Sequence, residues 1–438
     1  MGRWSRFRTK KNSAGVDRAV RSLVRDAYRR VPLFHARLDD AGFQPDRICT
    51  AKDLRMLPIT TREAYLSGSR SQILRAGTNP DRCHRARTSG TTGTPLIVHL
   101  NRYEALFRRL LLFNALRKNA HLSVPLSVAD IGVNTVKKEA SRGDVTQSIG
   151  LVLVTGISRF LTPREQADRL LRTSPQVITG APSCLELVAE ELQRRSQTAA
   201  VRPKLVAPRG EVLQPLARAL LEEVFRCKIA DYYNCEEVGN IAWECPAQTG
   251  LFHINTAACI VEIVDAEGQA VSPGTEGSVV LTNLFNWTMP FIRYALGDRA
   301  TLLEPVGSRC ACGHEGPSMA ALAGRADDFI TLPSGDRVSP RTVIGLICSA
   351  SRRSDDKTAY HVRRYRVDQD SLDHVRVRIV PEHPLSPDLG ARIALALRGL
   401  SPDLRCDVEM VAELPPEDSA KFRIVTSHVR SPGPRSGD

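Results

Sequence analysis

The sequence of 438 residues carries a formal net charge of +13, and 42% of its residues are hydrophobic. A chain of this length is too long for one hydrophobic core and fits two or three domains. No apolar run reaches the roughly 18 residues that would suggest a membrane-spanning helix. The basic stretch of residues 1–13 has no apolar segment behind it, and we interpret it as a loose tail instead of a secretory signal.

Eleven cysteines without a secretory signal predict reduced thiols and a cytoplasmic protein. The positive charge comes mostly from arginines spread over the whole chain, with no interleaving of arginine and aromatic residues. Such a diffuse basic surface favours small phosphorylated ligands over nucleic acid or a membrane. A nucleic-acid-binding role stays as the last alternative, and it would show as steeply salt-dependent binding.

Strands and helices alternate in the first two thirds of the chain. Apolar spacing predicts early helices at residues 16–27, 61–66 and 103–116, whereas residues 120–160 give no clear pattern. Strands and helices then follow in turn at 175–180, 182–195, 205–207, 216–225 and 229–233. This alternation predicts a parallel sheet with ligands bound at the carboxyl ends of its strands.

The pattern changes after residue 260. The runs 260–264 and 278–281 are rich in β-branched residues and indicate an antiparallel or barrel-like part. After Asp327 a small α+β unit is expected, with strands near 361–367 and 374–379 and a helix over 387–397. We therefore predict a basic tail (1–13), a large N-terminal domain (14–326), a C-terminal domain (327–430) and a disordered end (431–438).

One short stretch stands out chemically, Thr88-Ser89-Gly90-Thr91-Thr92-Gly93-Thr94-Pro95. Glycines let the backbone curl so that several N–H groups point inward, and hydroxyls add donors, a combination that cradles phosphate oxygens. Taken alone, the stretch could equally be a polar turn between strands. Further motifs follow it in a fixed order: Arg209-Gly210-Glu211, Tyr233-Asn234-Cys235-Glu236-Glu237, Arg293-Tyr294-Ala295-Leu296-Gly297-Asp298, Gly324-Arg325-Ala326-Asp327-Asp328 and Ala420-Lys421.

This series resembles the motifs of adenylate-forming enzymes, which include acyl-CoA synthetases, peptide-synthetase adenylation domains and luciferases. The stretch 53–60 and the cysteine-containing pieces near 245 and 310 resemble one branch, the phenylacetate-CoA ligase-like family. The resemblance implies an α/β fold with an α+β part: a large N-terminal domain of parallel sheets flanked by helices with a small barrel-like part, and a small mobile C-terminal domain.

The resemblance also assigns roles to residues. Lys421, Glu237 and Thr91 are expected to be catalytic, with Glu237 holding Mg²⁺ and Lys421 placed between the carboxylate and the α-phosphate. Asp327 is the expected hinge of the C-terminal domain. The expected ATP-binding residues are Ser89, Gly90, Thr91, Thr92, Gly93, Thr94, Gly210, Glu211, Tyr233, Asp298 and Arg325.

Three positions depart from the family pattern. Glu236 stands where the family has Thr or Ser, Asn234 replaces a glycine, and Ala420 replaces another. Two adjacent carboxylates, Glu236 and Glu237, would repel near phosphates unless Mg²⁺ lies between them.

A second group of residues has the chemistry of a metal site. Cys310 and Cys312 are one residue apart, and Cys245 precedes His253 by eight positions. Together they could hold a structural Zn²⁺ with tetrahedral geometry, and either His314 or Cys259 could replace one ligand. The alternative is a set of reduced buried cysteines without a metal.

We expect an enzyme that uses ATP and Mg²⁺ to adenylate a carboxylic acid, aryl or arylacetic, and then forms a thioester with CoA. The first alternative passes the acyl group to an amine or a carrier protein. The second is a non-catalytic nucleotide-binding relative. The expected partners are the small-molecule acid and CoA or another acyl acceptor, with no nucleic acid and no membrane, in a monomer or homodimer.

Overall fold

The computed structural model describes residues 13–88, 94–133, 152–304, 310–353, 360–382, 386–414 and 422–429. None of the helices in these ranges combines the length and the apolar character needed to cross a bilayer. Short 3₁₀ helices punctuate the connections: η1 (Pro45–Arg47), η2 (Ala51–Met56), η3 (Pro80–Arg82), η4 (Thr198–Ala200) and η5 (Ala326–Asp328).

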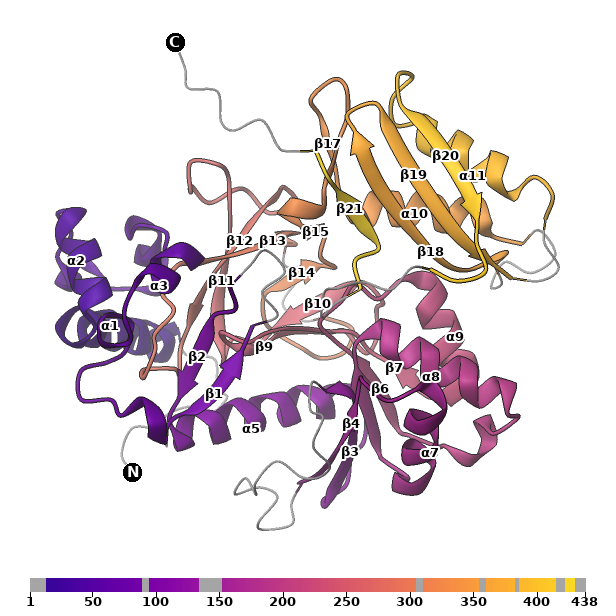
Figure 1. Ribbon diagram of the computed structural model, residues 1–438. Coiled ribbons are helices and arrows are strands. Elements are labelled where there is room, and N and C mark those ends of the chain that lie inside the picture. The colour runs from indigo at the N-terminus through magenta and orange to yellow at the C-terminus, as the bar shows by residue number, and fades with distance from the viewer. Residues whose placement is uncertain are drawn as a thin grey trace.

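The N-terminal part is helical and lies far from the C-terminal part (Figure 1). A small antiparallel hairpin follows it and leads into the long helix α5. The elements are α1 (Ser13–Arg30), α2 (Pro32–Asp40), α3 (Arg62–Ser67), α4 (Arg70–Ile73), β1 (His84–Arg87), β2 (Ile97–Leu100) and α5 (Arg102–Asn119).

A five-stranded parallel sheet in the order β4-β3-β5-β6-β7 forms the next layer. Alternate residues of its strands point to opposite faces: Val177 packs toward α5, whereas Ile178 packs toward the other helices. Both faces are therefore covered, as parallel sheets require. The elements are β3 (Leu126–Val133), β4 (Val152–Ser158), α7 (Pro163–Thr173), β5 (Val177–Gly180), α8 (Pro182–Arg194), β6 (Leu205–Pro208), α9 (Pro215–Phe225) and β7 (Lys228–Ile229).

Two four-stranded antiparallel sheets follow, with the strand orders β14-β10-β9-β8 and β11-β12-β13-β15. The short edge strands β14 and β15 come after β13 in the chain, and each adds to one of the two sheets. Their strands are β8 (Tyr232–Cys235), β9 (Gly239–Glu244), β10 (Leu251–Ile254), β11 (Cys259–Val264), β12 (Glu276–Asn283), β13 (Tyr294–Thr301), β14 (Ser318–Ala320) and β15 (Gly324–Arg325).

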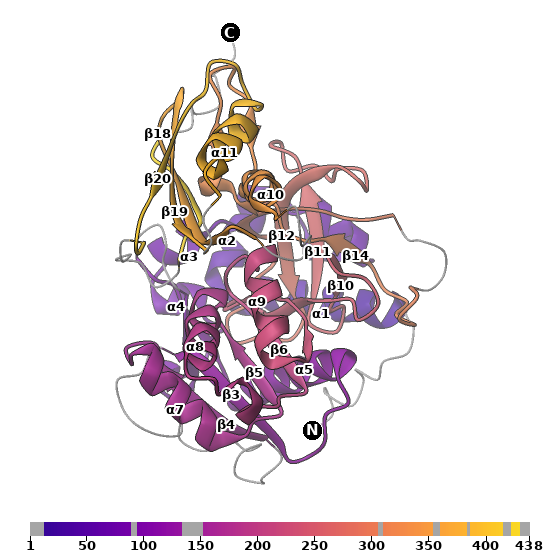
Figure 2. The ribbon, with the colours of Figure 1, turned by 90° about the vertical axis from the view of Figure 1, so that its right-hand side faces the viewer.

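The C-terminal part has a hydrophobic core of its own and lies above α8 and α9 in both views (Figures 1 and 2). Its main sheet has the order β20-β19-β18-β21. Its elements are β16 (Ile330–Thr331), β17 (Arg337–Val338), α10 (Pro340–Ser351), β18 (Val362–Ser371), β19 (His374–Pro381), α11 (Leu389–Arg398), β20 (Arg405–Met410) and β21 (Val425–Ser427). The proposed domain boundary at residues 326 and 327 stays a prediction.

Most of the elements expected from apolar spacing are present, and one expectation is wrong. The run 229–233 is not a single strand, because β7 ends at Ile229 in the parallel sheet and β8 begins at Tyr232 in an antiparallel sheet. Between them, the backbone N–H of Asp231 donates to the carboxylate of Glu244 at 3.0 Å. The chain therefore leaves one sheet and enters another within a run that is β-rich throughout.

Arg293 ties the N-terminal helices to strand β13. Only 3% of this residue is exposed, and it has a positive φ of 42°. Its guanidinium donates to the backbone oxygens of Arg55 (2.9 Å), Leu57 (2.6 Å) and Gly268 (3.0 Å) and lies 3.3 Å from the carboxylate of Glu262. One buried cation therefore satisfies carbonyls from separate segments, which makes it a structural residue.

Replacing this cation should be costly. We expect Arg293→Ala to lower the free energy of unfolding by about 3 kcal/mol or more, since it leaves a buried carboxylate and three carbonyls without their donor. Urea denaturation followed by tryptophan fluorescence measures the change. The control is Arg405→Ala, whose side chain is 71% exposed and pairs with Asp373; it should change stability by less than about 1 kcal/mol. Equal losses in the two variants would contradict the role of Arg293.

Candidate active site

A cavity of about 460 Å³ lies where the turn after β6, the strands β8 and β13 and the C-terminal part meet. Of the residues predicted from the sequence, the structure brings the following to its wall: Gly210, Glu211, Tyr233, Glu237, Asp298, Arg325 and Asp327. These residues come from four separate segments of the chain. Their convergence on one cavity is what the motif series predicted.

Two predicted segments fall outside the described residues. These are Ser89, Gly90, Thr91, Thr92 and Gly93 of the proposed phosphate loop, and the proposed catalytic Lys421 with Ala420 before it. The described residues next to them, Thr88 and Phe422, both line the cavity. Thr94 is described, but it is not among the residues of the cavity wall.

The hydroxyl of Tyr233 joins two of the strands at the cavity. It donates to Oδ2 of Asp298 at 2.7 Å, and so it connects β8 with β13. Burial raises the pKa of Tyr233 well above its usual value, which keeps the hydroxyl a neutral donor. Arg325 lies opposite Asp298 in the register of β13 and β15. The site thus holds an aromatic ring, a carboxylate and a cation side by side.

Glu237 is almost completely buried, with 5% exposed. Tyr294 donates to its Oε1 at 3.2 Å, and its backbone oxygen accepts from the side chain of Asn283 at 2.8 Å. Burial raises the pKa of Glu237 above the usual carboxyl value. A carboxylate held in such surroundings gains from a nearby cation, and its oxygens are the ligand type that Mg²⁺ prefers.

The neighbouring Glu236 has its own cation. Arg108 of α5 donates to Oε2 of Glu236 at 2.8 Å and to its backbone oxygen at 2.9 Å. Gly239 leaves room for Arg108, because a Cβ at this glycine would lie 2.8 Å from Cγ of the arginine. The repulsion expected between the two adjacent carboxylates is therefore offset by an arginine that no motif predicted.

Arg62 is a second residue that the sequence did not single out. Its guanidinium donates to Oγ1 of Thr88 at 3.1 Å and to the backbone oxygen of Thr94 at 2.9 Å. Arg62 therefore bridges the two ends of the proposed phosphate loop, and it also lines the cavity. In the sequence, Arg62 is a basic residue that follows Thr60-Thr61, more than twenty positions before the loop. A single basic residue in that place belongs to no recognisable motif, so it could not be predicted as a site residue.

The carboxylate of Glu211 accepts hydrogen bonds from two backbone N–H groups. One comes from Ser183 at 3.2 Å and the other from Phe422 at 3.0 Å. Nη2 of Arg209, two positions before Glu211, donates to both carboxylate oxygens of Asp130 at 2.7 and 2.8 Å. The Arg209-Gly210-Glu211 motif therefore organises the carboxyl ends of the parallel strands.

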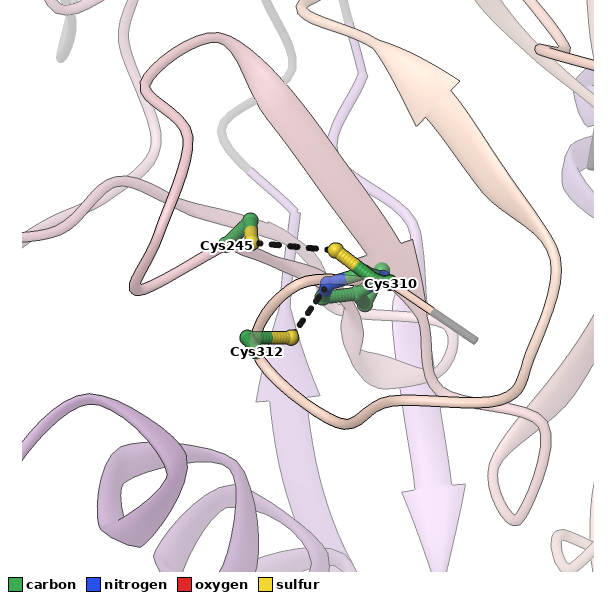
Figure 3. Close-up of side chains that lie close together, drawn as sticks. Cys245, Cys310 and Cys312 are labelled. Carbon is green, nitrogen blue, oxygen red and sulfur yellow. Dashed lines mark hydrogen bonds between the residues drawn. The ribbon is translucent and has the colours of Figure 1, made fainter. Parts of the chain in front are cut away.

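The predicted metal ligands also come together. The ligand atoms of Cys245, His253, Cys310 and Cys312 all lie within 4.8 Å of one another. Cys245 Sγ is 3.6 Å from Cys310 Sγ, and His253 Nε2 is 3.1 Å from Cys312 Sγ (Figure 3). The cluster forms because Cys245 follows β9, His253 lies in β10, and the two other cysteines precede β14, which pairs with β10.

The donor set of this cluster fits a tetrahedral metal ion. Burial lowers the pKa of His253 to about 4, so the imidazole stays neutral, as a metal ligand must be. Its Nδ1 is buried without a hydrogen-bond partner among the described residues. Of the two alternative ligands, His314 lies with its ring tilted against that of His253, 4.3 Å between centroids, and Cys259 is buried in the hydrophobic core near Asn255.

Comparisons with known proteins agree with the motif series, although no family model matches the chain. The phenylacetate-coenzyme A ligase of Thermus thermophilus is 24% identical over 391 residues, which are 85% of this chain and 82% of that protein. The enzyme of the same name from Escherichia coli K12 is 26% identical over 320 residues, covering 70% of each chain.

Solved structures agree in fold. A 2-hydroxyisobutyryl-CoA ligase in its postadenylation state has a TM-score of 0.78 at 17% identity, covering 95% of this chain and 89% of that one. The same ligase in its thioesterification state has a TM-score of 0.63, covering 96% and 90%. A benzoate CoA ligase from Burkholderia xenovorans LB400 has a TM-score of 0.54 at 19% identity, covering 80% and 69%.

The resemblance and the fold class expected from the motifs are thereby confirmed. The matches extend over most of the chain, from the helical N-terminal part to the small C-terminal unit. The chain is a sequence relative of the phenylacetate-CoA ligases, and it has the fold of the adenylate-forming CoA ligases.

Proposed function

We propose that this chain is an AMP-forming acid–thiol ligase. In the first step, a carboxylate oxygen attacks the α-phosphorus of ATP, the bond to the bridging oxygen breaks, and pyrophosphate leaves. In the second step, the CoA thiolate attacks the acyl carbon, AMP leaves, and the thiol proton passes to solvent. An aryl or arylacetic acid is the proposed substrate, in keeping with the phenylacetate-CoA ligases and the benzoate ligase among the relatives.

One observation carries the proposal. Residues from four distant motifs line a single cavity, and the segment that adjoins Lys421 closes one side of it. A phosphoanhydride substrate needs a place for its base, its ribose and its phosphates together. A structural role would not require Tyr233, Glu237, Asp298 and Arg325 to converge in this way.

The side chains suit particular parts of ATP. We place the ribose hydroxyls at Asp298, because a carboxylate accepts hydrogen bonds from two hydroxyls well, and we place the adenine ring against Tyr233. We assign the phosphate oxygens to Arg325 and Arg62, two of the arginines that line the cavity. Glu237 would hold Mg²⁺, which when bound neutralises the charge of the phosphates.

Substrate turnover tests this proposal directly. We expect pyrophosphate release from ATP and Mg²⁺ to turn over only when CoA and an accepted acid are both present. The measurement uses a panel of aryl, arylacetic and aliphatic acids, each with and without CoA. Slow release that CoA does not change would favour an amine or carrier protein as the acceptor. No release with any acid, from folded protein, would overturn the proposal in favour of a non-catalytic relative.

Lys421 should act in the first step alone. We expect Lys421→Ala to slow acyl-AMP formation by about 100-fold or more, because the negative charge that develops at the α-phosphate loses its cation. Thioester formation from synthetic acyl-AMP and CoA should change little. Pyrophosphate release and thioester absorbance measure the two steps separately. Equal losses in both would refute the role that we give to the lysine.

We further propose that the cluster of Cys245, His253, Cys310 and Cys312 holds a structural Zn²⁺. Three thiols and one neutral imidazole are a common ligand set for such an ion. The ion would pin the segment before β14 to the edge of the β9–β10 pair. That sheet also carries Tyr233 on β8, so a stable metal site would support the cavity wall indirectly.

Elemental analysis tests the metal site. We expect about one zinc per purified chain, and we expect Cys312→Ser to lower both the zinc content and the melting temperature. Cys227→Ser is the matched control, since this thiol is free and lies outside the cluster; it should leave the zinc content unchanged. Well-folded wild-type protein without any metal would remove the proposal.

A further inference from the structure

The carboxylate of Glu211 lies between two parts of the chain that are distant in sequence. Its Oε2 accepts from the backbone N–H of Ser183, in the first turn of α8, at 3.2 Å. Its Oε1 accepts from the backbone N–H of Phe422, in the C-terminal part, at 3.0 Å. Phe422 directly follows Lys421, so this hydrogen bond holds the backbone next to the proposed catalytic lysine.

The N-terminus of α8 and the turn at Gly210 both favour the position that the carboxylate of Glu211 takes. Ala181, the residue before α8, offers no side-chain cap, and Pro182 has no N–H, so the N–H of Ser183 is the group of the first turn that needs a partner from outside the helix. The carboxylate of Glu211 satisfies this N–H and interacts well with the helix dipole. Gly210, with a φ of +86°, gives the backbone the turn that presents Glu211 to both partners.

Helix α8 also contacts the C-terminal part directly, through acidic side chains. Glu186 and Glu190 are four residues apart and so lie on one face of α8. Arg364 of β18 lies 3.9 Å from the carboxylate of Glu186 and 3.5 Å from that of Glu190. Arg363 lies 3.8 Å from Glu190. Two arginines of β18 therefore face two acidic side chains of α8 across the contact.

The segment after Phe422 is also anchored within the C-terminal part. Arg423 pairs with Asp328, next to the proposed hinge Asp327. Phe422 packs against the C-terminal core, together with Val212 from the turn after β6. The backbone beside Lys421 is thus fixed by its own domain on one side and by Glu211 on the other.

We propose that Glu211 is a positioning residue, which docks the backbone beside Lys421 onto α8 and thereby favours the domain arrangement that forms acyl-AMP. The inference rests on the proposed function, and the expected direct contact of Glu211 with ATP stays a prediction. The higher TM-score against the postadenylation state than against the thioesterification state of the same ligase, 0.78 against 0.63, supports it. A C-terminal part that turned away would release Phe422, Arg363 and Arg364 together.

Hydrogen exchange on the full chain without ligands tests the docking. In Glu211→Ala, the amides of the peptide that contains Phe422 should exchange at least about 10-fold faster than in wild type, because the charged acceptor is gone. Peptides from β18 and β19 should keep their protection. Glu267→Ala, a change at an exposed glutamate in a turn, is the control and should alter neither peptide. Unchanged exchange at Phe422 would overturn the proposal.

The two half-reactions then test the consequence for catalysis, with phenylacetate and synthetic phenylacetyl-AMP as probes. Glu211→Ala should slow acyl-AMP formation by about 10- to 100-fold, with thioester formation from phenylacetyl-AMP within about threefold of wild type. Arg364→Ala should also slow acyl-AMP formation more than thioester formation, but by a smaller factor. Arg405→Ala should leave both rates unchanged. Equal losses in both half-reactions, or a higher KM for ATP as the only effect, would overturn the positioning role.

Two further arms keep the result interpretable. Glu211→Gln preserves the shape of the side chain and one acceptor oxygen, so this variant should fold. Its exchange rate at Phe422 and its rate of acyl-AMP formation should lie between those of wild type and Glu211→Ala. If wild type forms neither product from these probes, the choice of acid or the proposed function fails, whereas the exchange at Phe422 still decides the docking. Loss of docking with unchanged acyl-AMP formation would overturn the positioning role alone.

Discussion

The buried guanidinium of Arg293 is the constraint on which the site depends. Arg293 lies immediately before β13, and its guanidinium joins the segment of residues 55–57 to the turn at Gly268. The backbone of Thr60 then pairs with β13 on either side of Tyr294. Two consequences follow for the cavity: Tyr294 is directed to Glu237, and Arg62 is brought to the ends of the proposed phosphate loop.

The wall of the cavity is rich in carboxylates, which would repel the phosphates of a bound nucleotide. Contacts with neighbouring groups offset part of this negative charge. Several of the acidic residues that line the cavity have a specific partner: Arg108 pairs with Glu236, two backbone N–H groups bind Glu211, and Tyr233 donates to Asp298. Glu237 accepts from the hydroxyl of Tyr294, and burial raises its pKa. A metal ion bound beside it would therefore stabilise its charged form.

The sequence predicted the elements and the cavity residues that belong to short motifs, since each motif keeps its side chains within one turn or strand. It did not predict Arg62 or Arg108, because their partners are brought to them by tertiary pairing, 26 to 128 positions away in the chain. The break between β7 and β8 was missed for a similar reason. The carboxylate that interrupts the ladder at Asp231 belongs to Glu244, on another strand.

The departures from the family motifs bear on whether the site is catalytic. A degenerate site would be expected to leave its altered residues without partners, yet Asn234 accepts from the side chain of Asn240 at 2.9 Å, and Asn255 in turn donates to Asn240 at 3.1 Å. This chain of amides crosses the irregular pairing of β8 with β9 and holds the strand that carries Tyr233, directly after which Glu236 begins the turn with Glu237. Arg108 holds Glu236 in turn. The two departures that lie within the described residues, Asn234 and Glu236, therefore make contacts that keep the cavity wall in place.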